Sequence, residues 1–336
     1  MPYLRRTVLG MATLAAIAAG AIAVASASAS THAQAASSKY SVVYIPGLTG
    51  NPFYSTVACG AAVEAKKLGD VSFSTQGAAT FAVNAQTPIV EAVTARHPTA
   101  IMISNDDPTA MIPPLLKAQR AGIKIINIDG DLTNLSVGVT NIQSDDLLGG
   151  QEAGEEMAEL TKDAAGTVLI EDNSPGYLVS EQRRNGLIDY LKQHDPKATV
   201  LPIVYTDNSV ATAAADVRAA AAAHSNLIGV YTVETNNTQG ALTGLEAAHL
   251  TGKVKLIGFD TSSPIVAGIR SGKVSADIVQ YPYGEGMLGL QDAVLAAEGK
   301  KVPREQHLPF VVATQANINT ATVQKFIYKT SCSVPV

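Results

Sequence analysis

The sequence contains no tryptophan, and charged residues make up only 16% of its 336 positions. Its formal charge is −5, and its lysines and arginines form no cluster, which argues against nucleic acid as a partner. The abundant residues are Ala, Val, Ile and Gly. This composition suits strands buried on both faces between Ala-rich helices. The length exceeds that of a usual single domain, so we expect two.

No apolar run is long enough to read as a membrane anchor. Arg5 and Arg6 precede a short apolar stretch at 8–24, and a small-residue tract at 25–38 follows it. This order is typical of an export signal, so residues 1–35 are expected to be a signal peptide that is cleaved near Ala35. The arginine pair only loosely matches a twin-arginine signal, and the general secretory route stays open. The mature protein is expected to be soluble, in the periplasm or outside the cell.

Cysteine is scarce, and no cysteine lies near the cleavage point, which argues against a lipid anchor. The only two cysteines are Cys59 and Cys332. An exported protein can keep a disulfide, and we favour one here over two unpaired thiols. It would tie the C-terminal tail to the first helix and contribute about 3–5 kcal/mol.

Signals for metal or cofactor chemistry are weak. The six histidines show neither paired metal spacing nor a neighbouring nucleophile motif. Asp129-Gly130-Asp131 is only a fragment of a calcium loop. The segment 284–289 spells a dinucleotide fingerprint, but it comes late in the chain, and glycines that allow close helix packing explain it better. We therefore predict no metal, no cofactor and no catalytic residue.

Short apolar strands alternate with helical stretches along the chain. Strands are predicted at 41–45, 71–75, 100–104, 124–129, 137–141, 166–171, 199–205, 227–232, 254–260 and 275–280. Helices are predicted at 55–67, 82–95, 109–121, 147–161, 180–194, 210–224 and 238–250. This alternation indicates an α/β fold with parallel sheets covered by helices on both faces. Two such series indicate two similar lobes.

The first strand leads directly into a candidate ligand corner. The run 40–45 ends in the loop 46–50, and Asn51, Phe53 and Tyr54 follow where a helix should begin. Aromatic rings can stack on the C–H face of a sugar, and an amide offers a donor and an acceptor to hydroxyl groups. The alternative is a plain strand-to-helix turn with both rings in the core.

Polar residues also follow the other predicted strands, where open parallel sheets bind ligands. In the first series these residues are Ser104, Asn105, Asp129 and Asp131. In the second series they include Glu234, Asp260 and Gln280. Ionised carboxylates accept hydrogen bonds from hydroxyl groups, so two facing sets predict a cleft for a neutral polyhydroxyl compound.

Six segments in order then resemble one known family. They are Asn51-Pro52-Phe53-Tyr54, Ile128-Asp129, Ser144 to Gly150, Arg183-Arg184-Asn185-Gly186, Ile257-Gly258-Phe259-Asp260 and Ile278-Val279-Gln280. With these segments the chain resembles, over residues 40–314, the ribose-type sugar-binding proteins of bacterial ABC importers, which have the type I periplasmic binding fold. The resemblance implies two lobes joined by a three-segment hinge.

The resemblance also implies domains and roles. The implied domains are 40–144 plus 281–307, then 145–280 plus 308–316. Residues 317–336 lie beyond the region of resemblance and are predicted to form a C-terminal helix, at 317–328, and a tail of unknown role. Asn51, Phe53 and Tyr54 would line the sugar, and Asp129, Asp260 and Gln280 would bind its hydroxyls.

The chain departs from the ribose pattern at several site positions. Gly130 and Asp131 stand where ribose binders have an arginine after the aspartate, and Glu181 replaces a sugar-contacting arginine, with Arg183 two residues on. Glu234 replaces an asparagine. A different pentose, a hexose, a polyol or a furanose signal fits as well as ribose, and a cationic or amino-bearing ligand is the minor alternative. The full predicted ligand set is Asn51, Phe53, Tyr54, Ser104, Asn105, Asp129, Asp131, Glu181, Arg183, Glu234, Asp260 and Gln280.

The expected function is that of a monomeric extracytoplasmic binding protein that closes on a small carbohydrate or polyol and delivers it to an ABC permease. One alternative is a sensor that presents its bound state to a membrane receptor. Another is a carbohydrate-acting enzyme, for which Asp131 and Glu234 are the only pair of carboxylates to nominate. A transcriptional repressor of the same fold is excluded by the export signal and by the lack of a basic segment before Tyr40.

Overall fold

The structure is a computed structural model that describes residues 38–162, 164–329 and 331–332. The expected signal peptide lies outside this part of the chain. Across the described residues, no helix combines the length and apolar character that a membrane span requires.

The first lobe is built on a six-stranded sheet in which every pair of neighbours is parallel. Its order is β12-β5-β4-β3-β1-β2. The strands are β1 (Tyr40–Ile45), β2 (Val71–Thr75), β3 (Ala100–Ile103), β4 (Lys124–Ile128), β5 (Thr140–Ser144) and β12 (Glu305–Leu308). Central strands such as β3 are buried along their whole length, as expected for a parallel sheet covered on both faces.

The second lobe has a seven-stranded sheet of the order β13-β11-β10-β9-β6-β7, in which β8 also pairs with β6. The strands are β6 (Gly166–Asp172), β7 (Ala198–Val200), β8 (Val204–Tyr205), β9 (Leu227–Thr232), β10 (Lys255–Phe259), β11 (Ala276–Val279) and β13 (Val311–Thr314). Only β13 runs antiparallel to its neighbour. The single strand predicted at 199–205 is divided here because Pro202, which has no N–H, falls between β7 and β8.

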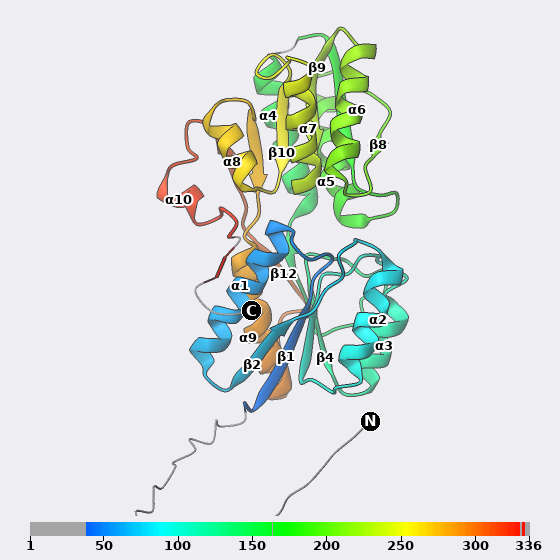
Figure 1. Ribbon diagram of the computed structural model, residues 1–336, viewed down its shortest axis with the longest axis vertical. Helices are drawn as coiled ribbons and strands as arrows, with labels where there is room; N and C mark the ends of the chain where they lie inside the picture. The colour runs from blue at the N-terminus through cyan, green and yellow to red at the C-terminus, as the bar shows by residue number, and fades with distance from the viewer. Residues whose placement is uncertain (1–37, 163, 330, 333–336) are drawn as a thin grey trace, which may run out of the picture. The chain divides into compact units, whose positions relative to one another are not determined.

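Helices cover both faces of each sheet (Figure 1). In the first lobe, α1 (Pro52–Leu68) and α9 (Pro282–Ala297) share a hydrophobic core with one face, and α2 (Val83–Thr94) and α3 (Ile112–Arg120) share one with the other. In the second lobe, α4 (Asp146–Thr161) and α5 (Leu178–His194) cover one face, whereas α6 (Val210–Ala223), α7 (Thr235–Ala247) and α8 (Ser263–Arg270) cover the other.

Three connections join the two lobes: β5 to α4, β11 to α9, and β12 to β13. The predicted fold class, two α/β lobes with a three-segment hinge, is confirmed. The residue boundaries of the domains stay a prediction. The tail is less helical than expected. The helix predicted at 317–328 is limited to the four residues of α10 (Ala321–Gln324).

Candidate functional site

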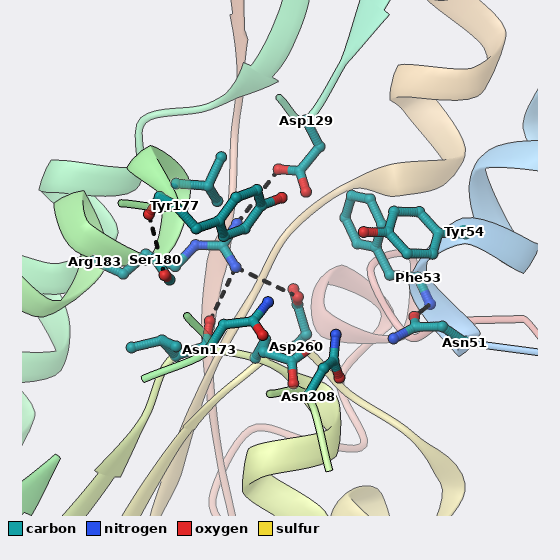
Figure 2. A pocket seen from close by; sticks show the side chains of 13 residues that line it. Asn51, Phe53, Tyr54, Asp129, Asn173, Tyr177, Ser180, Arg183, Asn208 and Asp260 are labelled. Carbon is teal, nitrogen blue, oxygen red and sulfur yellow. Dashed lines mark hydrogen bonds and ion pairs between the residues drawn. The ribbon is translucent and has the colours of Figure 1, made fainter. Parts of the chain in front are cut away.

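The main pocket of interest lies at the carboxyl ends of the strands and takes residues from both lobes (Figure 2). Its lining consists of Asn51, Phe53, Tyr54, Asp129, Asn173, Tyr177, Val179, Ser180, Arg183, Asn208, Val233, Glu234 and Asp260. This is the place where ligands bind in open parallel sheets.

The first lobe contributes an aromatic wall at the start of α1. Asn51 is the N-cap of this helix, and its side-chain oxygen accepts a hydrogen bond of 2.8 Å from the backbone N–H of Phe53. The cap leaves the NH2 group of Asn51 as a donor for the pocket. The rings of Phe53 and Tyr54 meet edge to face at 5.4 Å. The local sequence therefore fixes two aromatic faces and one amide at the pocket.

Two aspartates occupy matching positions in the two lobes. Asp129 directly follows β4 and Asp260 directly follows β10, and both are buried. Both have left-handed backbones, with φ of 46° and 71°. Their N–H groups donate to the neighbouring strands, to Ile142 O at 2.9 Å and to Ile278 O at 2.8 Å. Aspartate tolerates this conformation better than most residues, and such strained positions cluster at functional sites.

Arg183 joins these two aspartates. Its guanidinium donates to Asp146 Oδ1 at 2.7 Å, to Asp129 Oδ1 at 3.3 Å and to the carbonyl of Val233 at 3.0 Å. It also lies 3.6 Å from Asp260 Oδ2 and 4.0 Å above the ring of Phe259. Only 2% of Arg183 is exposed. A buried arginine in this setting is held by its partners and has few donors left for a ligand.

Carboxylates outnumber cations in the pocket, and burial raises their pKa values. The pKa of Asp129 lies well above its usual value because of burial, although Arg183 lowers it. Burial raises the pKa of Asp146 to about 6 and that of Glu234 to about 8. The pKa of Asp260 is also raised by burial, while Arg183, Tyr328 and Gln280 act in the opposite direction. Near neutral pH such a site offers both acceptors and protonated donors to hydroxyl groups.

Two contacts between side chains connect the lobes at the pocket rim. Tyr177, which precedes α5, packs edge to face on Phe81 of the first lobe at 5.3 Å. Gln182 on α5 donates to Asp131 Oδ2 at 3.2 Å. Phe81 therefore lies beside a lining residue and is half-buried.

Seven of the twelve predicted ligand residues line the pocket, namely Asn51, Phe53, Tyr54, Asp129, Arg183, Glu234 and Asp260. The other five lie outside the lining and are engaged with protein groups. Ser104 hydrogen-bonds Tyr44 at 2.9 Å, and Asn105 donates to Asp131 O at 3.2 Å. Asp131 accepts from Asn141, Gln143 and Gln182.

The remaining two belong to the second lobe. Glu181 accepts from the N–H of Gly176 at 3.1 Å, next to its own helix. Gln280 donates to Asp260 Oδ1 at 3.0 Å, so it orients a lining residue from behind.

Six lining residues were not in the predicted set: Asn173, Tyr177, Val179, Ser180, Asn208 and Val233. Asn173 follows β6 and could be found by the strand-end rule. Tyr177 follows the same strand after a short loop and directly precedes α5. Asn208 follows β8 in a left-handed conformation, with φ of 58°. Its signal is the Asp207-Asn208 pair, because both residue types favour such turns.

The weak motifs have structural explanations. A side chain at Gly286 would overlap the carbonyl oxygen of Val57 on α1, so this glycine of the segment 284–289 allows α9 to pack closely on α1. In the calcium-loop fragment Asp129-Gly130-Asp131, a Cβ at Gly130 would lie only 2.5 Å from Asn105 Oδ1. The glycine therefore gives room to the Asn105 side chain. Within the described residues, no group of three His, Cys, Asp or Glu side chains is arranged to hold a metal ion.

The pocket is closed in this structure. Its cavity volume of about 20 Å³ holds one water molecule and is too small for a sugar. A sugar would need more room than this arrangement gives, and hinged domains in general make such room by opening.

Comparisons with known proteins match this geometry. The chain is 27% identical to the ribose import binding protein of Escherichia coli over 272 residues. The aligned region covers 80% of this chain and 88% of that protein. It is similar to an ABC transporter solute-binding protein of Agrobacterium vitis solved with α-D-tagatopyranose, at 31% identity and a TM-score of 0.83, over 87% of this chain and 100% of that one.

A carbohydrate transporter solute-binding protein of Agrobacterium radiobacter, solved with D-arabinose, gives 28% identity and a TM-score of 0.81 over 86% and 98% of the two chains. The profile of the periplasmic binding protein domain matches residues 42–301. These matches confirm the resemblance that the six sequence segments indicated. The chain belongs to the periplasmic binding protein family.

Proposed function

We propose that this protein is the extracytoplasmic binding subunit of an ABC importer, which captures a small sugar or polyol between its lobes and delivers it to a membrane permease. The observation that carries the proposal is the pocket itself, which is lined by two aromatic rings of the first lobe and by carboxylates and amides of both lobes. The names of its relatives support transport of a sugar. The proposal includes that the protein is a monomer and that it is exported to the periplasm or to the outside of the cell.

Capture needs a ligand that touches both lobes. Only a ligand that binds the closed form better than the open form can shift the hinge. Asp129 and Asp260 are the matched acceptors for this purpose, because they belong to different sheets. The rings of Phe53 and Tyr54 would stack on the C–H face of the same ligand.

The chain is a binding protein and not an enzyme. The relatives that it matches are also named as binding proteins. The pair nominated for catalysis is not assembled either. Glu234 lines the pocket, whereas Asp131 lies outside the lining and accepts from three side-chain amides.

The lining favours a neutral, hydroxyl-rich ligand. Arg183 is the one arginine in the lining, and its donors are directed to Asp146, Asp129 and Val233. An anionic ligand would therefore meet carboxylates rather than a free cation. We define a sugar panel of D-ribose, D-arabinose and D-tagatose as the first set of probes.

Titration calorimetry with the sugar panel tests the proposal. The wild-type protein should bind at least one sugar, and Asp129→Asn and Asp260→Asn should each weaken that binding by about 1.5–3 kcal/mol, since each removes a charged acceptor. Asparagine is the right replacement because it also tolerates the left-handed backbone. Asp207→Asn is the matched control, because Asp207 is exposed, has φ of 49° and lies outside the lining. Unchanged affinity in both pocket variants would refute the site.

A further inference from the structure

The C-terminal tail passes from the second lobe to the first. After β13, Gln315 donates to the carbonyl of Arg270 on α8 at 3.0 Å, and Arg270 donates to Asn319 at 3.2 Å. Further on, Lys329 N–H donates to Thr56 on α1 at 2.7 Å. A disulfide then joins Cys332 to Cys59 on the same helix, with Cα atoms 5.3 Å apart. The tail is therefore a fourth connection between the lobes, and it is covalently anchored.

Tyr328 lies where this tail crosses. It is buried, with 8% of the residue exposed. Its hydroxyl donates to Asp260 Oδ1 of the second lobe, the same oxygen that accepts from Gln280. Its ring meets Phe53 of the first lobe edge to face at 5.8 Å. Tyr328 does not line the pocket, but it contacts a lining residue from each lobe.

We propose that Tyr328, carried across the hinge by the disulfide-anchored tail, is a positioning residue of the sugar site that holds Phe53 and Asp260 in their ligand-binding arrangement. This inference rests on the proposed function. It assigns a role to the tail that neither the strand-end pattern nor the family resemblance predicted.

Two physical effects support the role. The tyrosine hydroxyl and Gln280 together fix Oδ1 of Asp260, which leaves Oδ2 on the side of Arg183. Donation by Tyr328 also lowers the pKa of Asp260 against the effect of burial, so it favours the ionised acceptor. The disulfide keeps the tyrosine close to its partners, because an anchored segment binds at a high effective concentration.

The hydroxyl group can be tested separately from the ring. Tyr328→Phe keeps the edge-to-face contact with Phe53 and loses the bond to Asp260. We expect its affinity for the tightest-binding sugar of the panel to fall about tenfold, while its melting temperature stays within about 2 °C of the wild type. Lys325→Ala, at an exposed position of the same tail, is the matched control and should bind as the wild type does.

The anchor is tested by the double variant Cys59→Ser with Cys332→Ser. Stopped-flow or surface-based kinetics should show faster dissociation of the sugar with little change in association, because the closed arrangement loses a contact. Cys59 is buried, so the serine variant can lose stability for other reasons. Wild-type protein treated with a reductant is therefore measured alongside it and should show the same kinetic change.

A measurement without sugar separates this inference from the proposed function. Small-angle scattering of Tyr328→Ala and of the reduced protein should give a larger radius of gyration than the oxidised wild type, because the lobes lose the bridge between them. A wild type that binds none of the three sugars would count against the proposed function, while scattering would still decide the role of the tail. Tyr328→Phe with wild-type sugar kinetics, or Tyr328→Ala with a wild-type radius, would overturn the positioning role.

Discussion

The two lobes share one scaffold and differ in their chemistry. In the first lobe, a side chain at Gly60 of α1 would overlap the carbonyl oxygen of Tyr283, and one at Gly286 of α9 would overlap that of Val57. In the second lobe, a side chain at Gly186 of α5 would overlap the carbonyl oxygen of Leu147. A side chain at Gly150 of α4 would overlap that of Arg183. In all four cases the residue that provides the carbonyl oxygen comes three positions before the glycine of the opposite helix. Both lobes therefore use the same glycine-dependent helix contact beside the pocket.

This correspondence places Val57 and Arg183 at equivalent positions. Val57 is a fully buried core residue, whereas Arg183 reaches Asp129, Asp146 and Asp260. At these matched positions the first lobe therefore has an apolar core residue, and the second has a buried arginine that reaches carboxylates of both lobes. The difference teaches that the backbone contacts set the scaffold, while a few side chains at matched positions decide which surface of a ligand each lobe can recognise.

The largest effect should come from breaking the charged side of this comparison. Arg183→Ala leaves three buried aspartates without their cation and should lower the free energy of unfolding by about 3–5 kcal/mol. It should also abolish measurable sugar binding. Chemical denaturation followed by circular dichroism measures the first effect, and calorimetry the second.

Arg218→Ala is the control for that experiment, because Arg218 is an exposed arginine of α6. Its effect should stay within about 0.5 kcal/mol. If Arg183→Ala were equally mild, the asymmetry between the lobes would have no energetic basis.

Much of the fold and part of the site could be predicted from the sequence. Apolar runs fix the strands, and polar residues just after them fix the pocket end, which is why Asp129 and Asp260 could be placed in advance. Local bonding could not be read in this way. Ser104 and Asn105 also follow a strand, but Tyr44 and the backbone of Asp131 bind their side chains.

The tail was harder to predict than the lobes. Its pattern indicated a helix at 317–328, but only Ala321–Gln324 is helical, and Tyr328 is directed to Asp260 by the path of the chain to Cys332. The sequence favoured the bond between Cys59 and Cys332, yet the spacing of two cysteines does not say which residues lie along the way. Such tertiary placement depends on contacts far apart in the sequence.

The shared scaffold can be tested by filling the matched glycines. Gly286→Ala and Gly150→Ala should each lower the free energy of unfolding by about 2 kcal/mol, because overpacking outweighs the gain in helix propensity. Similar losses measured by urea denaturation would support the equivalence of the two helix pairs. Gly268→Ala is the control and should cost less, since the three atoms nearest to its Cβ would belong to the side chains of Val274 and Leu242 and not to the backbone. Losses that differ by more than about 2 kcal/mol between the lobes would contradict the equivalence.

The smallest expected effect compares two buried carboxyls that cap helices in different lobes. Asp106 accepts from the N–H of Ala82 before α2, Glu234 is the N-cap of α7, and burial raises both pKa values to about 8. A folded-state pKa above the unfolded value means that the native state binds more protons, so stability falls as pH rises from about 4.5 to about 8.

Asp106→Asn and Glu234→Gln each replace a titrating carboxyl group by a neutral amide. The amide oxygen can still accept the hydrogen bond at the start of the helix. Each variant should match the wild type at pH 5 and melt about 2–4 °C higher at pH 9, corresponding to about 1 kcal/mol. Glu305→Gln, at an exposed strand position, should keep the wild-type slope. Equal slopes in all four proteins would mean that neither carboxyl is protonated in the native state.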